Sequence, residues 1–150
     1  MHIGFYSIHC LMAIRVRVKL SSMMGKVTII KALVTTGYES QEPEILIPRS
    51  VAEELGLLPK LPSGSEVRNY VLADGTVTRL IFIPSAVKVW VVEGDREVGG
   101  VEAHVTVSER ADEVLLSDKL ASKLGIVLLD IGEGLWCFRD ELGRTVRRSL

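Results

Sequence analysis

The sequence contains few cysteines and almost no net charge. Its two cysteines, Cys10 and Cys137, have no CxxC spacing, so neither a metal site nor a redox motif is supported. We expect two reduced thiols, with a disulfide between them as the alternative. The formal net charge of −1 over 150 residues gives no electrostatic bias toward nucleic acid or an anionic membrane. Basic residues gather near the end, at Arg144, Arg147 and Arg148, where we expect a solvated tail rather than a phosphate site.

Long apolar runs are also missing. The longest nearly uncharged segment near the start, Ile3 to Ile14, is too short to span a bilayer, and it lacks the basic region and cleavage site of a signal peptide. We therefore expect a cytoplasmic protein with no membrane partner. Residues 1–11 precede the regular pattern, and we expect a loosely attached or disordered N-terminal extension, or a consequence of start-codon choice. Residues 12–150 are expected to form one domain, because 47% apolar residues suffice for a real core.

Most of the chain alternates between apolar and polar residues with the period of two that is typical of strands. Strands are predicted at 14–20, 27–34, 45–47, 67–72, 76–83, 86–92, 97–107, 113–116, 126–130 and 135–139, with a short edge strand within 142–146. Two short helices are predicted, over 51–55 and 118–124, with Ser50 and Ser117 as N-caps. The pattern predicts an all-β fold with two short helices.

One strand-and-helix unit occurs twice. Glu44–Pro48 precedes a helix that ends Ala-x-x-Leu-Gly-aliphatic, and Glu113–Ser117 precedes a helix with the same ending. Two glycine-capped helices can match by chance, but the shared order of strand, cap and stop favours a duplication. A duplicated unit in a strand-rich chain predicts a closed barrel with a pseudo-twofold axis.

The strand at 27–34 ends in Thr35-Thr36-Gly37 and passes into a polar loop. This resembles the active-site strand of retropepsin-like, single-lobe aspartic proteases, which ends in Asp-Thr-Gly. The later parts follow in a similar order: a small helix, a hairpin tipped by Asp74-Gly75 at the place of the flap, and Leu115-Leu116-Ser117 before a second helix. The resemblance covers roughly Ile14 to Phe138 and implies a closed, acid-protease-like β-barrel.

Two departures from the family pattern bear on function. Thr35 stands where the catalytic aspartate is expected, and Ser117 stands where the family has a glycine. In the family, each subunit of a dimer supplies one aspartate, and the two carboxylates share a proton. A threonine hydroxyl cannot perform this acid–base work, which contributes about 10²–10⁴-fold. Thr36 keeps the hydroxyl that in the family bonds across the dimer interface, and Gly37 completes the motif.

The resemblance therefore implies a catalytically inactive homodimer with a peptide-binding or scaffold role and with no cofactor or metal. The alternative is an active endopeptidase that uses an unconventional acid, either Glu39, four residues past Thr35, or Asp118, at the start of the second helix. Simpler interpretations are a loop acid for Glu39, a helix-dipole residue for Asp118 and a turn residue for Asp74. Thr35 as a nucleophile would need an adjacent base, which the neighbouring chain does not offer. An interaction module without a functional groove is a third possibility.

The loop after Gly37 carries three acids, Glu39, Glu42 and Glu44. They could bind a divalent cation, but the spacing is not that of an EF-hand, so a solvated surface loop is the favoured interpretation. The sequence does not place any of the histidines, His2, His9 or His104, as a base for Thr35.

Overall fold

The computed structural model describes residues 2–3 and 13–150, and most of the expected extension, Cys10 included, lies outside them. Strands account for 52% of the described residues. The strands are β1 (His2–Ile3), β2 (Ile14–Ser22), β3 (Val27–Val34), β4 (Glu44–Pro48), β5 (Glu66–Leu72), β6 (Val77–Val92), β7 (Glu97–Ser108), β8 (Val114–Leu116), β9 (Ile126–Asp130), β10 (Leu135–Phe138) and β11 (Arg147–Arg148). The helices are α1 (Arg49–Glu54), α2 (Asp118–Lys123) and the 3-10 helix η1 (Arg139–Glu141). The predicted all-β class with two short α-helices is confirmed.

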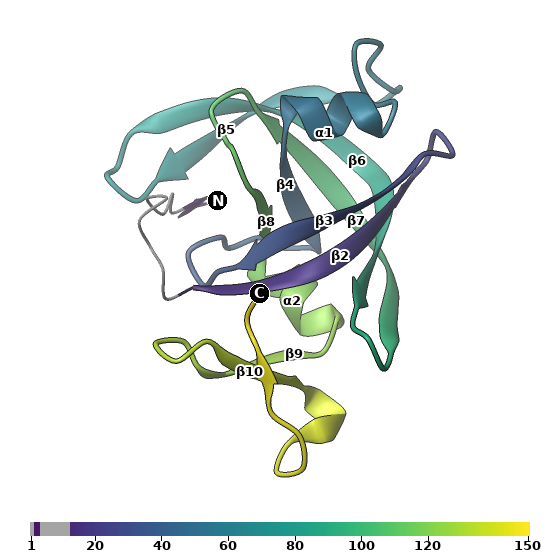
Figure 1. The fold of residues 1–150 in the computed structure, drawn as a ribbon. Helices are drawn as coiled ribbons and strands as arrows, with labels where there is room; N and C mark the ends of the chain where they lie inside the picture. Colours follow the sequence, from purple (N-terminus) through teal and green to yellow (C-terminus); the bar gives the residue numbers. More distant parts are fainter. Residues whose placement is uncertain (1, 4–12) are drawn as a thin grey trace.

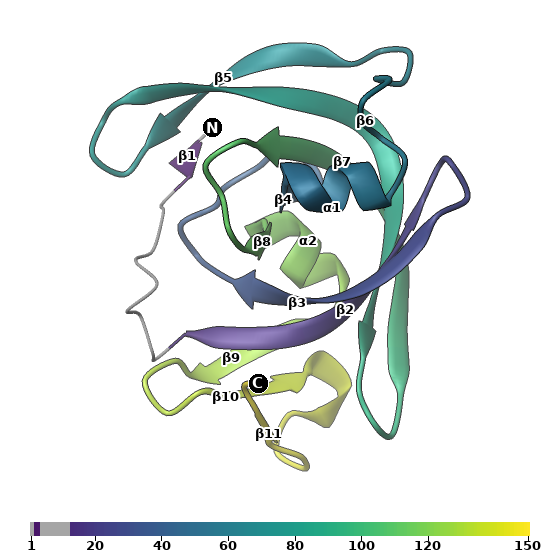
Figure 2. The same cartoon turned by 45° about the horizontal axis from the view of Figure 1, so that its top comes forward.

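Six strands close into a barrel in the order β2, β3, β8, β4, β7 and β6, because β6 pairs with both β7 and β2 (Figures 1 and 2). A single β6 takes the place of the two strands predicted at 76–83 and 86–92, so that division is wrong. The break in the pattern is a local register shift between Ile83 and Val87, where Ser85 has a φ of 46°. Such an irregularity bends a strand without ending it.

The short strand β8 lies between β3, to which it is parallel, and β4, to which it is antiparallel. Leu33, Leu115 and Leu46 form one row across these three strands, since Leu115 pairs with both of the others. Neighbouring residues on the opposite face fill the barrel, whereas the leucine row belongs to a second, smaller cluster covered by Tyr38, Tyr70 and Leu80. These strands are therefore buried on both faces. Tyr38 comes from the loop after β3, and Tyr70 and Leu80 come from the β5–β6 hairpin.

The β5–β6 hairpin extends beyond the barrel and turns at Asp74-Gly75, as predicted. Gly75 has a φ of 86°, which favours glycine. In both views the tip of this hairpin lies on the same side of the molecule as the end of β3 (Figures 1 and 2). Because Tyr70 and Leu80 pack on the outer leucine row, the base of the hairpin is fixed to the barrel.

The two helices follow the matching strands β4 and β8, but only one has a side-chain cap. The Ser117 hydroxyl accepts a hydrogen bond from the amide of Leu120, which confirms its predicted capping role. Ser50 is not a cap, because α1 begins at Arg49 with Pro48 in the N-cap position. Neither these helices nor any other helix in the described part of the chain has the length and apolar character needed to cross a membrane.

A three-stranded sheet of β9, β10 and β11 packs against the barrel through Trp136 and Phe138. Arg147 on β11 contradicts the expected solvated tail. Its guanidinium lies 5.2 Å from the Phe138 ring and forms ion pairs with Glu141 (2.7 Å) and Glu93 (3.2 Å). The edge strand predicted within 142–146 falls instead at Arg147–Arg148, where Trp136 pairs with Arg147. Arg147 thus joins the sheet to the turn that connects β6 and β7.

We expect Arg147→Ala to lower the free energy of unfolding by about 1–3 kcal/mol, because the largely buried carboxylate of Glu141 loses its two hydrogen bonds from Arg147 and keeps Arg96 as its cation. Urea unfolding at neutral pH measures the change. The matched control is the exposed neighbour Arg148→Ala, expected to stay within about 0.5 kcal/mol of the wild type. Equal effects of the two variants would contradict a specific role for Arg147.

Candidate functional site

Thr35 lies just past the end of β3, in a tight turn closed by its own side chain. It is 6% exposed, and its hydroxyl oxygen accepts a hydrogen bond from the backbone amide of Gly37 at 3.0 Å. The next residue, Thr36, is exposed. Because side chains alternate along β3, Thr35 lies on the same outer face as Leu33. The hydroxyl at the position expected for an aspartate is thus engaged in local backbone structure.

None of the carboxylates considered as replacements for the missing aspartate is hydrogen-bonded at the Thr35 turn. Glu39 is exposed. Asp118 fastens the loop to α2, since its Oδ1 accepts hydrogen bonds from the backbone amides of Ser40 (3.1 Å) and Lys119 (2.7 Å). Asp74, at the hairpin tip, accepts from the amide and hydroxyl of the second residue after it, and these bonds hold the pKa of its carboxyl below the usual value. No hydrogen bond joins any of these acids to Thr35.

Ser117 occupies the position between the Thr35 turn and β4. Val34 pairs with Leu116, so Ser117 lies beside Thr35 at the next position along the strands. Its hydroxyl oxygen accepts a hydrogen bond from the amide of Glu44 at 3.1 Å in addition to capping α2. A glycine could provide neither contact, so serine has a structural reason to be here.

Replacing Thr35 by valine keeps the shape of the side chain but removes the acceptor for the Gly37 amide. We expect a loss of about 1 kcal/mol in the free energy of unfolding. Thr36→Val, at the exposed neighbour, is the control and should change it by less than about 0.5 kcal/mol. Thermal and urea unfolding provide the measurement, and a Thr35→Val variant as stable as the wild type would show that the hydroxyl contact contributes nothing.

Glu44 is the acid that the sequence interpretation placed wrongly. It was expected in a solvated loop, but it is 2% exposed and belongs to the first position of β4. The Tyr38 hydroxyl donates to its Oε2 at 2.5 Å and lies 3.0 Å from the hydroxyl of Thr106. Burial raises the pKa of Glu44, because a charged carboxylate loses its hydration there. The pKa of Tyr38 is raised for the same reason and by the neighbouring carboxylate.

Glu44 lines a pocket of about 470 Å³ on the outer face of the barrel. Its wall consists of residues from the loop after β3, from β4, from the β5–β6 hairpin with the bend that follows it, and from β7: Gln41, Glu42, Glu44, Arg68, Phe82, Pro84 and His104. Glu44 pairs directly with His104 across β4 and β7. The guanidinium of Arg68 lies 3.5 Å from the centre of the Phe82 ring and forms an ion pair with Glu66.

The orientation of His104 follows from its two hydrogen bonds. The backbone amide of Ser85 donates to Nδ1 at 2.9 Å, so we assign the ring proton to Nε2, which lies 2.5 Å from Oε2 of Glu42. The histidine therefore fixes the Glu42 side chain beside the pocket. Both imidazole nitrogens are used in this way, which leaves the ring poorly placed to act as a base.

The position of Glu44 in this pocket could have been predicted from the sequence, but the positions of its partners could not. Alternation along 44–48 places Glu44 on the same face as Leu46, which the repeat makes equivalent to Leu115. The partners Arg68, Phe82 and His104 come from strands whose register the sequence does not specify.

Glu44 also makes stability depend on pH in a definite direction. Since its pKa is raised in the folded state, its contribution to stability is fully present below the unfolded pKa of about 4.3 and is lost as the pH rises through the folded value. Glu44→Gln is neutral throughout. The unfolding free energy of the wild type minus that of Glu44→Gln should therefore fall as the pH rises from about 4.3 toward neutrality. Urea titrations at several pH values test this, and a difference that rises or stays constant would contradict it.

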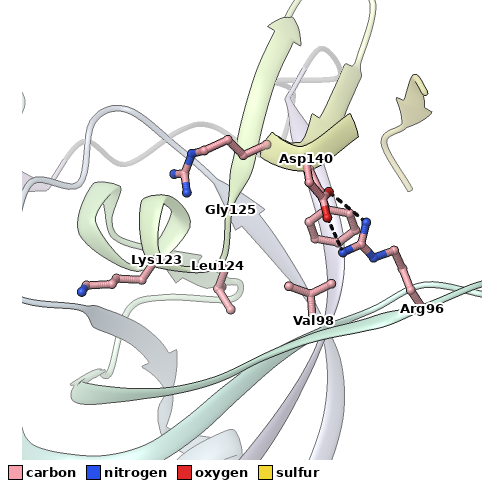
Figure 3. Close-up of a pocket in the computed structure, with 8 residues that line it drawn as sticks. Arg96, Val98, Lys123, Leu124, Gly125 and Asp140 are labelled. Atoms are coloured by element: carbon pink, nitrogen blue, oxygen red, sulfur yellow. Dashed lines mark hydrogen bonds and ion pairs between the residues drawn. The ribbon is translucent and has the colours of Figure 1, made fainter. Parts of the chain in front are cut away.

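A second hollow, of about 360 Å³, lies where β7, the end of α2 and η1 meet (Figure 3). Val98 and Leu124 form its apolar floor, and the ion pair of Arg96 with Asp140 (3.0 Å) closes one side. Lys123 lies on the opposite side in Figure 3. Because Arg96 is neutralised by Asp140 and also contacts Glu141, we interpret this hollow as part of the joint between the barrel and the three-stranded sheet.

Across residues 13–150 no group of three or more histidine, cysteine, aspartate or glutamate side chains is arranged to hold a metal ion. Cys137 is a buried thiol on β10, and burial raises its pKa. A comparison with protein-family models finds no match, and a comparison with curated proteins finds no similar sequence. Function must therefore be inferred from the residues and their geometry.

Proposed function

We propose that this chain is a retropepsin-like β-barrel protein that forms a homodimer and binds an extended peptide segment without cleaving it. The observation that carries the proposal is the Thr35 turn. A buried hydroxyl closed on the Gly37 amide holds the place where the resemblance expects the catalytic carboxylate. The turn is closed by this hydrogen bond, while the group needed for acid–base chemistry is missing.

The strand register supports the duplication on which the resemblance depends. In the repeat, Leu46 corresponds to Leu115, and these two residues pair with each other across β4 and β8. A two-fold axis between the strands would produce this pairing. The same axis relates Thr35 to Ser108, because β3 is parallel to β8 and β7 is parallel to β4. Each of these hydroxyls accepts a hydrogen bond from the amide two residues further on, at 3.0 and 3.2 Å.

The position of the hairpin supports a peptide-binding role. The β5–β6 hairpin packs on the outer leucine row, and its tip lies on the side of the molecule where β3 ends (Figure 2). A peptide between them would meet Thr36, which is exposed and available to a second subunit. A dimer would double this half-site, as the resemblance implies.

The alternative of an active endopeptidase receives less support. Asp118 is committed to two backbone amides, and Glu39 is exposed, with no hydrogen bond that aims it at Thr35. Neither acid has a neighbouring carboxylate with which to share a proton.

The proposal predicts a dimer that binds peptides and lacks peptidase activity. Light scattering at micromolar concentration should give twice the mass of the 16.5 kDa chain. An unfolded substrate protein should remain intact between about pH 4 and 7, the range in which a carboxylate dyad would work. Fluorescence anisotropy with extended peptides of mixed sequence should detect binding that depends on the dimer.

Two variants sharpen this test. Thr35→Asp restores the expected acid, and cleavage by this variant would support a retained groove. Cleavage by the wild type that disappears in Asp118→Asn or Glu39→Gln would instead establish the endopeptidase. A monomer that binds no peptide would contradict the proposal.

A further inference from the structure

The pocket beside Glu44 contains a buried carboxyl group that no described residue pairs with directly as a cation. Glu44 receives one side-chain hydrogen bond, from Tyr38 to Oε2, and it forms no ion pair with a described residue. Burial and the neighbouring Glu44 carboxylate raise the pKa of Tyr70, whose hydroxyl faces Glu44 without a well-formed hydrogen bond and has no other partner among the described residues. An ionised carboxylate in this position has no cation in direct contact, and Arg68 and His104 offset its charge only at longer range, so burial of the charge is costly.

A second carboxylate lines the same pocket. His104 is hydrogen-bonded to Oε2 of Glu42 at 2.5 Å. No described residue donates a hydrogen bond to Oε1 of Glu42. The cationic wall residue, Arg68, is already paired with Glu66 and stacked on Phe82. The pocket is thus lined by one buried carboxyl group, Glu44, and one exposed carboxylate, Glu42, while its guanidinium is paired with Glu66.

We propose that this pocket binds a primary alkylammonium group, with Glu44 at its floor and Glu42 at its entrance as the two charged acceptors. An ammonium group has three donors that can turn toward separate carboxylates, whereas a guanidinium prefers two oxygens of one carboxylate. Oε2 of both glutamates is occupied, so one oxygen of each is available, which suits the ammonium group. A volume of about 470 Å³ admits a lysine side chain or a short diamine.

The pocket is formed within one chain, so the proposal does not depend on the dimer or on the protease resemblance. If the proposed peptide-binding function holds, a lysine side chain of the bound segment is the natural source of the ammonium group. A free polyamine is the other source, and separate probes distinguish the two.

The test uses NMR titration of the full-length protein with Nα-acetyl-lysine methylamide, with its uncharged analogue Nα-acetyl-norleucine methylamide and with 1,4-diaminobutane. We expect the amides of His104 and Phe82 to shift with the lysine derivative or the diamine but not with the norleucine derivative. Glu44→Gln should weaken binding by at least about tenfold, since it removes a charge-assisted contact. The control Glu102→Gln removes an exposed acid of β7, the strand that carries His104, from outside the pocket and should leave binding unchanged.

Glu42→Gln provides an independent variant in case Glu44→Gln does not fold, and it should also weaken binding. Shifts with the lysine derivative alone would assign the site to a polypeptide side chain, and shifts with the diamine alone would assign it to a free amine. Equal binding of the norleucine derivative, no binding of either amine, or unchanged affinity in both glutamate variants would overturn the proposal. Peptide binding that persists without any lysine preference would overturn it and leave the proposed function intact.

Discussion

The position of β8 between β3 and β4 determines how the barrel closes and which loops meet beside it. This strand has only three residues, yet it pairs on both sides and contributes to both apolar clusters. Because the backbone there is buried on two faces, every polar group at the strand ends needs a local partner. Ser117 meets this need by accepting from Glu44 and Leu120. The turn at Thr35 meets it with its own hydroxyl.

The barrel does not need an acid at position 35. Closure of the barrel comes from strand pairing and from the leucine row, and neither involves the side chain at that position. Threonine at position 35 accepts the hydrogen bond of the Gly37 amide and adds no charge. In a dimer, two carboxylates meeting at the axis would repel unless they shared a proton, and threonine removes that conflict together with the chemistry. Under the proposed function, the scaffold is kept while the reaction is lost.

The sequence predicts the local elements well, because alternation and turn residues act over a few positions. The strands at 14–20 and 27–34, the turn at Asp74-Gly75 and the cap at Ser117 all follow from such signals. The errors come from tertiary contacts. The strands predicted at 76–83 and 86–92 are one strand, because pairing with β7 carries β6 through the bend. Arg147 looked like a tail residue, although it is held by carboxylates more than fifty positions earlier in the chain.

The error that matters most for function is the prediction that Glu44 lies in a solvated loop. Three acids in a loop favour a solvated loop, and only the pairing of β4 with β7 buries the last of them beside His104. A leucine or glutamine at this position would avoid the desolvation of a carboxylate, so glutamate reduces the stability that the fold could have. A group that conflicts with its surroundings in this way is characteristic of a functional site. The conflict disappears when a cation enters the pocket, because the charge that burial disfavours then has its partner.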